Sequence, residues 1–139
     1  MTARLVPAAV AAALAVLSTG CGSGAHPATP AGQAGSRATA ATTSPGGAQQ
    51  VTIHATDGFR FEPASVTAHT GALTVTLVND TSYPHNLSVA DLHTTSETVT
   101  GGTGTNTSTF TLTFSRPGTY SFVCTFHSSA GMRGQFVIT

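Results

Sequence analysis

The stretch that most constrains the fold is residues 118–134, GTYSFVCTFHSSAGMRG, because it predicts a strand, a short loop and the start of a second strand. Side chains alternate between the two faces of a strand, so Tyr120, Phe122 and Cys124 share one face and Cys124 ends an inward-facing row. Residues 135–139 predict the final strand. We therefore expect a β-structure that carries the loop 124–134 at one end.

The side chains of this loop form a soft metal-ligand set. A thiolate, an imidazole and a thioether occur in the spacing C-x2-H-x4-M, at Cys124, His127 and Met132. Soft sulfur donors suit copper, and two His with one Cys and a weak axial Met describe an electron-transfer copper centre. The second imidazole has to come from outside the loop, and His85 is the obvious source. The sequence thus predicts one mononuclear copper site.

A simpler interpretation has to be weighed against this one. A buried single Cys usually behaves as a small hydrophobic residue, and one His or one Met carries little information alone. The chain, however, has two Cys and two Met, and Cys124 and Met132 are the only ones beyond the N-terminal region. They lie within nine residues of each other with His127 between them, which favours the metal site. His26, His54, His69 and His93 have no such companions and are expected to be exposed or hydrogen-bonded.

Residues 51–139 are expected to form the one folded domain, and its pattern is β throughout. Apolar residues alternate with Thr in residues 73–77 and 110–114, as in strands with one face in a core and one in water. Further strands are predicted at 51–53, 86–90 and 135–139, whereas the Thr- and Gly-rich residues 91–108 predict a surface excursion with one short strand near 97–100. Seven or eight short strands at this spacing indicate an all-β fold, a Greek-key β-sandwich or barrel.

The N-terminal residues 1–21 are typical of a secretion signal. Arg4 precedes the apolar run of residues 5–17, which is shorter than the roughly 20 residues that a membrane-spanning helix needs. Residues 17–21, LSTGC, resemble a bacterial lipoprotein cleavage site, although Ser18 stands where an aliphatic residue is preferred. We favour lipidation of Cys21, which would anchor the protein to the outer face of the cytoplasmic membrane. Ordinary cleavage to a soluble secreted or periplasmic protein is the alternative.

Residues 22–50 predict a disordered linker, because they contain almost only Gly, Ala, Ser, Thr, Pro and Gln and have little to bury. The chain has no Lys, and the domain carries three Arg against five acidic residues. There is no basic patch for nucleic acid and no acidic cluster for strong electrostatic steering. We expect a monomer that docks on protein redox partners largely through apolar and polar contacts.

With these motifs in place, residues 51–139 resemble the cupredoxins, the small blue-copper family that includes the plastocyanins. The segment Pro84-His85-Asn86 resembles the motif of the family's first ligand, and the loop 124–134 has plastocyanin-like spacing. Residues 61–63, FEP, and the strand 71–79 also fit. Phe126 is a departure, since the family often has Pro before the second His, and its aromatic bulk is expected to alter packing near the metal.

The resemblance implies His85, Cys124 and His127 as equatorial ligands, with Met132 as the long axial ligand. It also implies that Asn86 helps to fix the ligand loop and hydrogen-bonds near the thiolate. The implied function is that of a non-enzymatic carrier in which copper cycles between Cu(I) and Cu(II). The alternative is an exported copper-binding protein for copper storage or delivery, which would release its metal instead of holding it through redox cycles.

Overall fold

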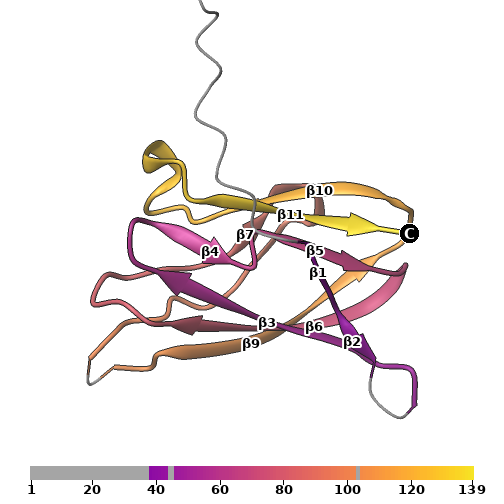
Figure 1. The fold of residues 1–139 in the computed structure, drawn as a ribbon, viewed down its shortest axis with the longest axis horizontal. Helices are drawn as coiled ribbons and strands as arrows, with labels where there is room; N and C mark the ends of the chain where they lie inside the picture. The colour runs from indigo at the N-terminus through magenta and orange to yellow at the C-terminus, as the bar shows by residue number, and fades with distance from the viewer. Residues whose placement is uncertain (1–37, 44–45, 103) are drawn as a thin grey trace, which may run out of the picture. The chain divides into compact units, whose positions relative to one another are not determined.

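The computed structural model describes residues 38–43, 46–102 and 104–139, and these residues form two packed β-sheets. Figure 1 shows the sheets as two layers, with β10, β11 and β5 in one and β3, β6 and β9 in the other. Eleven strands are present among the described residues, four of them only two residues long. The predicted all-β sandwich architecture is therefore confirmed, and the seven longer strands match the predicted number.

The first sheet has the strand order β2-β3-β6-β9, and β4 pairs with the free part of β3. Its strands are β2 (Thr42–Thr43), β3 (Gln49–Thr56), β4 (Arg60–Glu62), β6 (Gly71–Asn79) and β9 (Thr107–Phe114). The alternation of apolar residues with Thr positions these strands, because Leu73, Val75 and Leu77 of β6 all face inward and are fully buried. Strand β3 runs parallel to β6, with Ile53 beside Leu77.

The second sheet has the order β1-β5-β11-β10-β7-β8. Its strands are β1 (Thr39–Ala40), β5 (Ser65–Ala68), β7 (Ser88–Val89), β8 (Thr94–Thr95), β10 (Gly118–Val123) and β11 (Arg133–Ile138). Strands β10 and β11 form an antiparallel hairpin in which Val123 lies opposite Arg133. The ligand loop predicted from the sequence is the connection of this hairpin, so its two ends are held together by the strand pairing.

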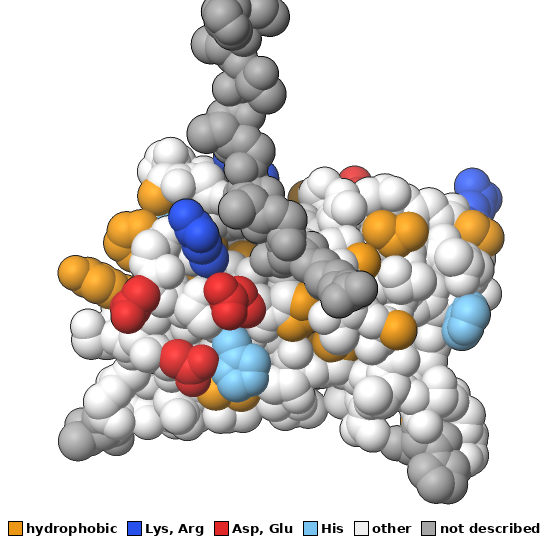
Figure 2. Space-filling view, viewed as in Figure 1, with side chains coloured by type: hydrophobic (Ala, Val, Ile, Leu, Met, Phe, Trp, Pro, Cys, Tyr) orange, Lys and Arg blue, Asp and Glu red, His pale blue; other side chains and the backbone are white. Residues whose placement is uncertain are grey.

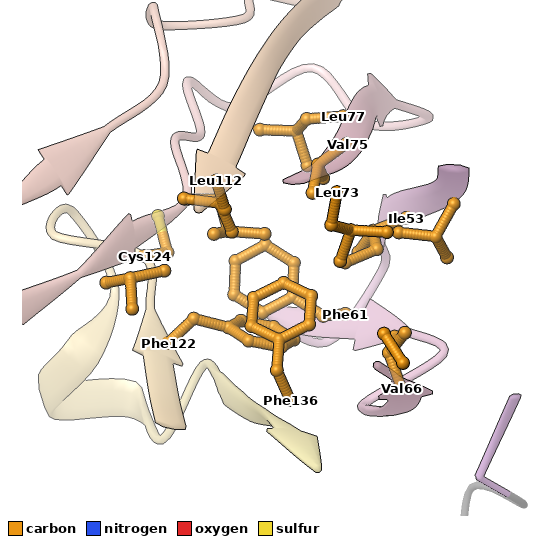
Figure 3. Close-up of a cluster of buried hydrophobic side chains, with 14 of the residues drawn as sticks. Ile53, Phe61, Val66, Leu73, Val75, Leu77, Leu112, Phe122, Cys124 and Phe136 are labelled. Atoms are coloured by element: carbon orange, nitrogen blue, oxygen red, sulfur yellow. The ribbon is translucent and has the colours of Figure 1, made fainter. Parts of the chain in front are cut away.

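The apolar core lies between the sheets, and Figure 3 shows its aromatic and aliphatic side chains with Cys124 at one edge of the cluster. The rings of Phe122 and Phe136 lie 4.7 Å apart between their centroids, and the ring of Phe61 packs edge-on against Phe122. Cys124 belongs to the same buried cluster. The core and the candidate ligand are thus continuous, and the core fixes the end of β10 from which Cys124 projects.

The structure differs from the linker prediction in one part of residues 22–50. Strands β1 and β2 lie within this segment, and β3 begins at Gln49, before the predicted domain start at residue 51. β1 pairs in parallel with β5, and the backbone N–H of Ala41 donates to the carbonyl of Thr67 at 2.8 Å. Two-residue strands at a sheet edge need no apolar pattern, which is why composition did not reveal them. Residues 1–37 and 44–45, including the predicted signal and Cys21, lie outside the described residues.

Residues 91–108 are also more ordered than the predicted surface excursion. They contain the end of the 3₁₀ turn Ala90–Leu92, strand β8 and the start of β9. The short strand expected near 97–100 is a single β-bridge between Val99 and His85. This bridge has a direct consequence for function, because it ties the excursion to a candidate metal ligand.

Charged side chains are sparse on the folded part of the chain. Figure 2 shows acidic and basic groups side by side on the face it presents, without a cluster of basic ones. Among the described residues, no helix is long and apolar enough to span a membrane.

Candidate metal centre

The loop between β10 and β11 holds its three candidate ligands through backbone hydrogen bonds. The N–H of Cys124 donates to the carbonyl of Met132 at 3.1 Å, and the N–H of Met132 donates to the carbonyl of His127 at 3.2 Å. A 3₁₀ turn, Ser128–Ala130, follows His127 and ends at Gly131 with φ of 87°. Glycine adopts this left-handed conformation without a steric penalty. The local backbone therefore presents all three side chains from one compact turn.

His85 reaches the same place from the other side of the sheet end. Its backbone N–H donates to the carbonyl of Val99 at 2.9 Å, and the N–H of Val99 donates back to the carbonyl of His85 at 2.8 Å. The His85 side chain is fully buried. A reciprocal pair of backbone bonds and complete burial leave the imidazole one position, which faces Cys124.

The ligand atoms have the separations that a metal ion requires. Cys124 Sγ lies 3.7 Å from His85 Nδ1 and 3.6 Å from His127 Nδ1. All three atoms lie within 4.8 Å of one another. In a trigonal plane, separations of 3.6 and 3.7 Å correspond to bonds of about 2.1 Å from a central ion, close to metal–nitrogen and metal–sulfur distances in proteins. The geometry accepts an ion without rearrangement.

Met132 lies at the far end of the same loop and is fully buried. It supplies a thioether, a soft and weak donor that occurs as the axial ligand of trigonal His₂Cys copper sites. The structure thus brings together the four residues that the sequence singled out, in an arrangement suited to one type 1 copper ion.

Burial and charge favour the metal-binding form of His85. Its pKa is lowered from the ordinary value, first because burial disfavours the charged imidazolium and second because His127 lies close by. A metal ligand has to be neutral imidazole. The environment of His85 therefore keeps its lone pair available.

Asn86 connects the two halves of the site through its side-chain amide. Its Oδ1 accepts the backbone N–H of Thr125 at 2.9 Å, and its Nδ2 donates to the Thr125 hydroxyl oxygen at 2.8 Å. Thr125 directly follows Cys124. These contacts support the expected role of Asn86 in fixing the ligand loop.

Three aromatic side chains surround His127, which is only half-buried. Phe59 stacks on the imidazole with 4.2 Å between ring centroids and 18° between the planes, and Tyr83 and Phe126 lie 6.3 and 6.4 Å away. Tyr83 is 55% exposed and Phe126 49% exposed. His127 therefore lies beside an apolar surface that is open to solvent.

Sequence reasoning missed Phe59. This residue has φ of 55°, a conformation that costs a side-chain-bearing residue about 1–2 kcal/mol. The stacking on His127 is a tertiary contact between residues 68 positions apart, and no local pattern marks it. The Asp57-Gly58 turn before it was the one available signal.

The remaining described histidines lie outside the site, as expected. His54 Nδ1 contacts the Asp80 carboxylate at 2.7 Å, and His69 Nδ1 lies 2.9 Å from the Thr139 hydroxyl. His93 is exposed at the end of a 3₁₀ turn. His26 falls outside the described residues.

Fold and site together define a β-sandwich protein with one buried two-imidazole, one-thiolate metal centre at its end. The family model described as "Cupredoxin-like domain" matches residues 11–138, and the chain belongs to this family. None of the curated proteins compared with the chain matches it.

Solved structures share the fold at low identity. The metal-binding domain of the Cu(I)-exporting P-type ATPase CopA of Streptococcus pneumoniae, solved with Cu(I), is 17% identical with a TM-score of 0.61, covering 75% of this chain and 97% of that one. Auracyanin A, a blue copper protein of Chloroflexus aurantiacus, is 18% identical with a TM-score of 0.53, covering 65% and 98%. Oxidised plastocyanin of Dryopteris crassirhizoma is 28% identical with a TM-score of 0.48, covering 64% and 100%. The first two of these likenesses show the fold alone.

Proposed function

We propose that this protein is a type 1 blue copper protein that carries single electrons between protein redox partners outside the cytoplasmic membrane. The observation that carries the proposal is the trio of ligand atoms at the buried end of the sandwich, with Cys124 Sγ 3.6 and 3.7 Å from the two imidazole nitrogens. His85, Cys124 and His127 are the proposed equatorial ligands, and Met132 is the proposed axial one.

The ligand chemistry favours copper among the transition metals. One thiolate, two imidazoles and a weak thioether form the donor set of electron-transfer copper sites. Bound copper supplies one-electron cycling between Cu(I) and Cu(II). The chain's own contribution is to hold the donors still, because the β10–β11 hairpin, the Val99 bridge and the Asn86 contacts fix each ligand from a different direction.

A carrier role fits this centre better than an enzymatic one. Catalytic metal sites keep a coordination position open for water or substrate, whereas closed sites fill their positions with protein ligands. Four side chains converge here, and His85, Cys124 and Met132 are fully buried. An electron, unlike a substrate, needs no entry path to the ion.

His127 is the proposed route for the electron. It is the ligand that approaches the surface, and the exposed rings of Tyr83 and Phe126 flank it. A partner docked on these rings would lie close to the ligand imidazole. The sparse surface charge supports docking through apolar and polar contacts.

An extracytoplasmic location is part of the proposal. It rests on the signal-like residues 1–21, with Cys21 as the site of a lipid that would hold the protein at the outer membrane face. Globomycin-sensitive processing and labelling with a radioactive fatty acid, both absent from Cys21→Ala, would test it. Soluble secretion of the unlabelled protein would contradict the lipid anchor.

The metal proposal is tested by adding Cu(II) to the purified protein and recording visible absorption and electron paramagnetic resonance spectra. We expect an intense thiolate-to-copper band and a narrow hyperfine splitting. Cys124→Ser should abolish the band because it removes the thiolate. Cys21→Ser, which changes the chain's other Cys, is the matched control and should retain it.

The alternative function is copper storage or delivery, and the shared fold of the Cu(I)-exporter domain keeps it in view. Repeated reduction and reoxidation beside a Cu(I) chelator separates the two functions. An electron carrier keeps its copper through the cycles, whereas a delivery protein transfers it to the chelator. Colourless Cu(II) binding with tight Cu(I) binding would also favour delivery, and no copper binding at all would overturn both.

A further inference from the structure

The imidazole of His85 makes a contact on the side away from Cys124. Its Nε2 lies 2.9 Å from the hydroxyl oxygen of Thr81, four residues earlier in the chain. The other ring nitrogen, Nδ1, faces the Cys124 sulfur. Which nitrogen carries the proton in the neutral ring therefore decides whether Nδ1 can bind a metal.

The side-chain amide of Asn79 settles the direction of the next hydrogen bond. Its Nδ2 donates to the carbonyls of Tyr83 at 2.7 Å and Val99 at 3.1 Å. Its Oδ1 lies 2.9 Å from the backbone N of Thr81 and 3.0 Å from the Thr81 hydroxyl. Two carbonyls can accept only from the NH₂ group, so the amide orientation is fixed. Asn79 is 4% exposed and uses all its hydrogen-bonding capacity.

A hydroxyl group has one hydrogen to donate. The carbonyl oxygen of Asn79 has none, so the Thr81 hydroxyl donates to Asn79 Oδ1. The Thr81 oxygen is then an acceptor toward His85, and the proton between them belongs to His85 Nε2. It follows that Nδ1 of the neutral ring is unprotonated on the side where the ligand atoms meet.

Backbone packing holds the relay in place. The N–H of Asn79 donates to the carbonyl of Asn106 at 2.8 Å, and the N–H of Asp80 donates to the carbonyl of Ala55 at 3.0 Å. Gly101 packs so closely on the backbone of Thr81 that a Cβ atom at position 101 would overlap the Thr81 carbonyl. The Thr81 hydroxyl is therefore positioned by its surroundings and not by the metal site.

We propose that Asn79 and Thr81 form a hydrogen-bond relay that holds His85 in the Nε2-protonated tautomer with Nδ1 directed at the metal. Both are positioning residues, because they act through His85 and touch no metal ligand atom. The effect on copper rests on the proposed function, whereas the effect on the tautomer belongs to the metal-free protein. Outer contacts of this type typically change metal affinity by about 10–100-fold.

The test compares the wild-type protein with Thr81→Val and Thr81→Ala, which remove the hydroxyl, and Thr81→Ser, which keeps it. Thr76→Val is the matched control, because Thr76 lies on β6 and its hydroxyl contacts only Thr109 among the described residues. The readouts are the ¹⁵N chemical shifts of the His85 ring in the metal-free protein and the Cu(II) affinity by competition. Thermal unfolding shows whether each variant is folded.

In the wild-type protein, Thr81→Ser and the control, we expect a protonated Nε2 and an unprotonated Nδ1. In Thr81→Val and Thr81→Ala we expect a mixture of tautomers and copper affinity about 10–100-fold lower. A merely structural role of Thr81 would change unfolding without changing the tautomer of the folded variants.

The outcomes separate the two proposals. Normal blue copper in the wild type with an unchanged tautomer and affinity in both folded hydroxyl-free variants would overturn the relay and leave the copper function standing. A Thr81-dependent tautomer in a protein that binds no copper would overturn the copper function and support the relay.

Discussion

Asn86 occupies a position where one side chain serves two parts of the molecule. It follows the ligand His85 in sequence and hydrogen-bonds to Thr125, the residue after the ligand Cys124. It is 6% exposed, so water does not readily replace these bonds. Loss of the amide therefore affects the orientation of the thiolate as well as stability.

We predict that Asn86→Ala destabilises the metal-free protein by about 1–3 kcal/mol, because each lost hydrogen bond contributes about 0.5–1.5 kcal/mol. The thiolate-to-copper band should shift and the reduction potential should change. Denaturant unfolding, absorption and voltammetry measure these effects. Asn106→Ala is the control, because the Asn106 side chain contacts only the neighbouring Thr107 hydroxyl among the described residues. An unchanged spectrum and potential in Asn86→Ala would refute the role.

The ligand residues could be predicted from sequence because their chemistry is rare and local. Cys124, His127 and Met132 are scarce residue types within nine positions, and this coincidence needs no tertiary information. The contacts around them could not be predicted in the same way. Phe59 and Thr81 are ordinary residue types, and their roles come from tertiary packing and hydrogen-bond direction.

At the scale of strands, the β10–β11 hairpin transmits the order of the core to the ligand loop. Gly134 lies opposite Phe122 in this pairing, directly after the loop. A Cβ atom at position 134 would overlap the Phe122 ring and the carbonyl of Ala64. The absence of a side chain there lets β11 approach β10 and β5 together.

We predict that Gly134→Ala lowers the free energy of unfolding by about 1–3 kcal/mol, the usual effect of overpacking a core. Gly47→Asn is the control, because Gly47 has φ of 82°, which Asn tolerates, and nothing lies within 4 Å of an added Cβ. Urea unfolding monitored by circular dichroism compares the two variants. Equal stability of Gly134→Ala and the wild type would show that the strands relax without penalty.

Alternation predicted the strands with one buried face, and these include β6, β9 and β10. It missed β1, β2 and β8, which span two residues each and contain only Thr and Ala. Two residues have no measurable period, and their pairing partners lie far away in sequence. Such strands are determined by the sheet edge that receives them.

At the scale of the whole folded unit, the N-terminal strands close a sheet edge. β1 covers the outer edge of β5, and the side chain of Gln49 bonds both backbone groups of His69, with its Nε2 3.0 Å from the carbonyl oxygen and its Oε1 2.6 Å from the nitrogen. Figure 1 places β2 and the ligand loop with its 3₁₀ turn at opposite ends of the sandwich. These contacts therefore stabilise the domain without touching the metal site.

We predict that a fragment of residues 51–139 is less stable than one of residues 38–139 by about 2–4 kcal/mol, because it loses the Gln49 pair and the bonds of β1 and β2 at about 1 kcal/mol each. A domain of this size has little stability to spare, so this loss should appear as a clear drop in the denaturant midpoint. The thiolate-to-copper band should be the same in both fragments while they are folded, since the site lies at the other end. In the longer fragment, Gln49→Ala should reproduce part of the loss, and Gln135→Ala, whose side chain makes one long 3.4 Å contact with Ser65, should not. Equal midpoints for the two fragments would mean that the edge strands follow the fold without stabilising it, whereas a changed copper spectrum would mean that the two ends of the sandwich are coupled.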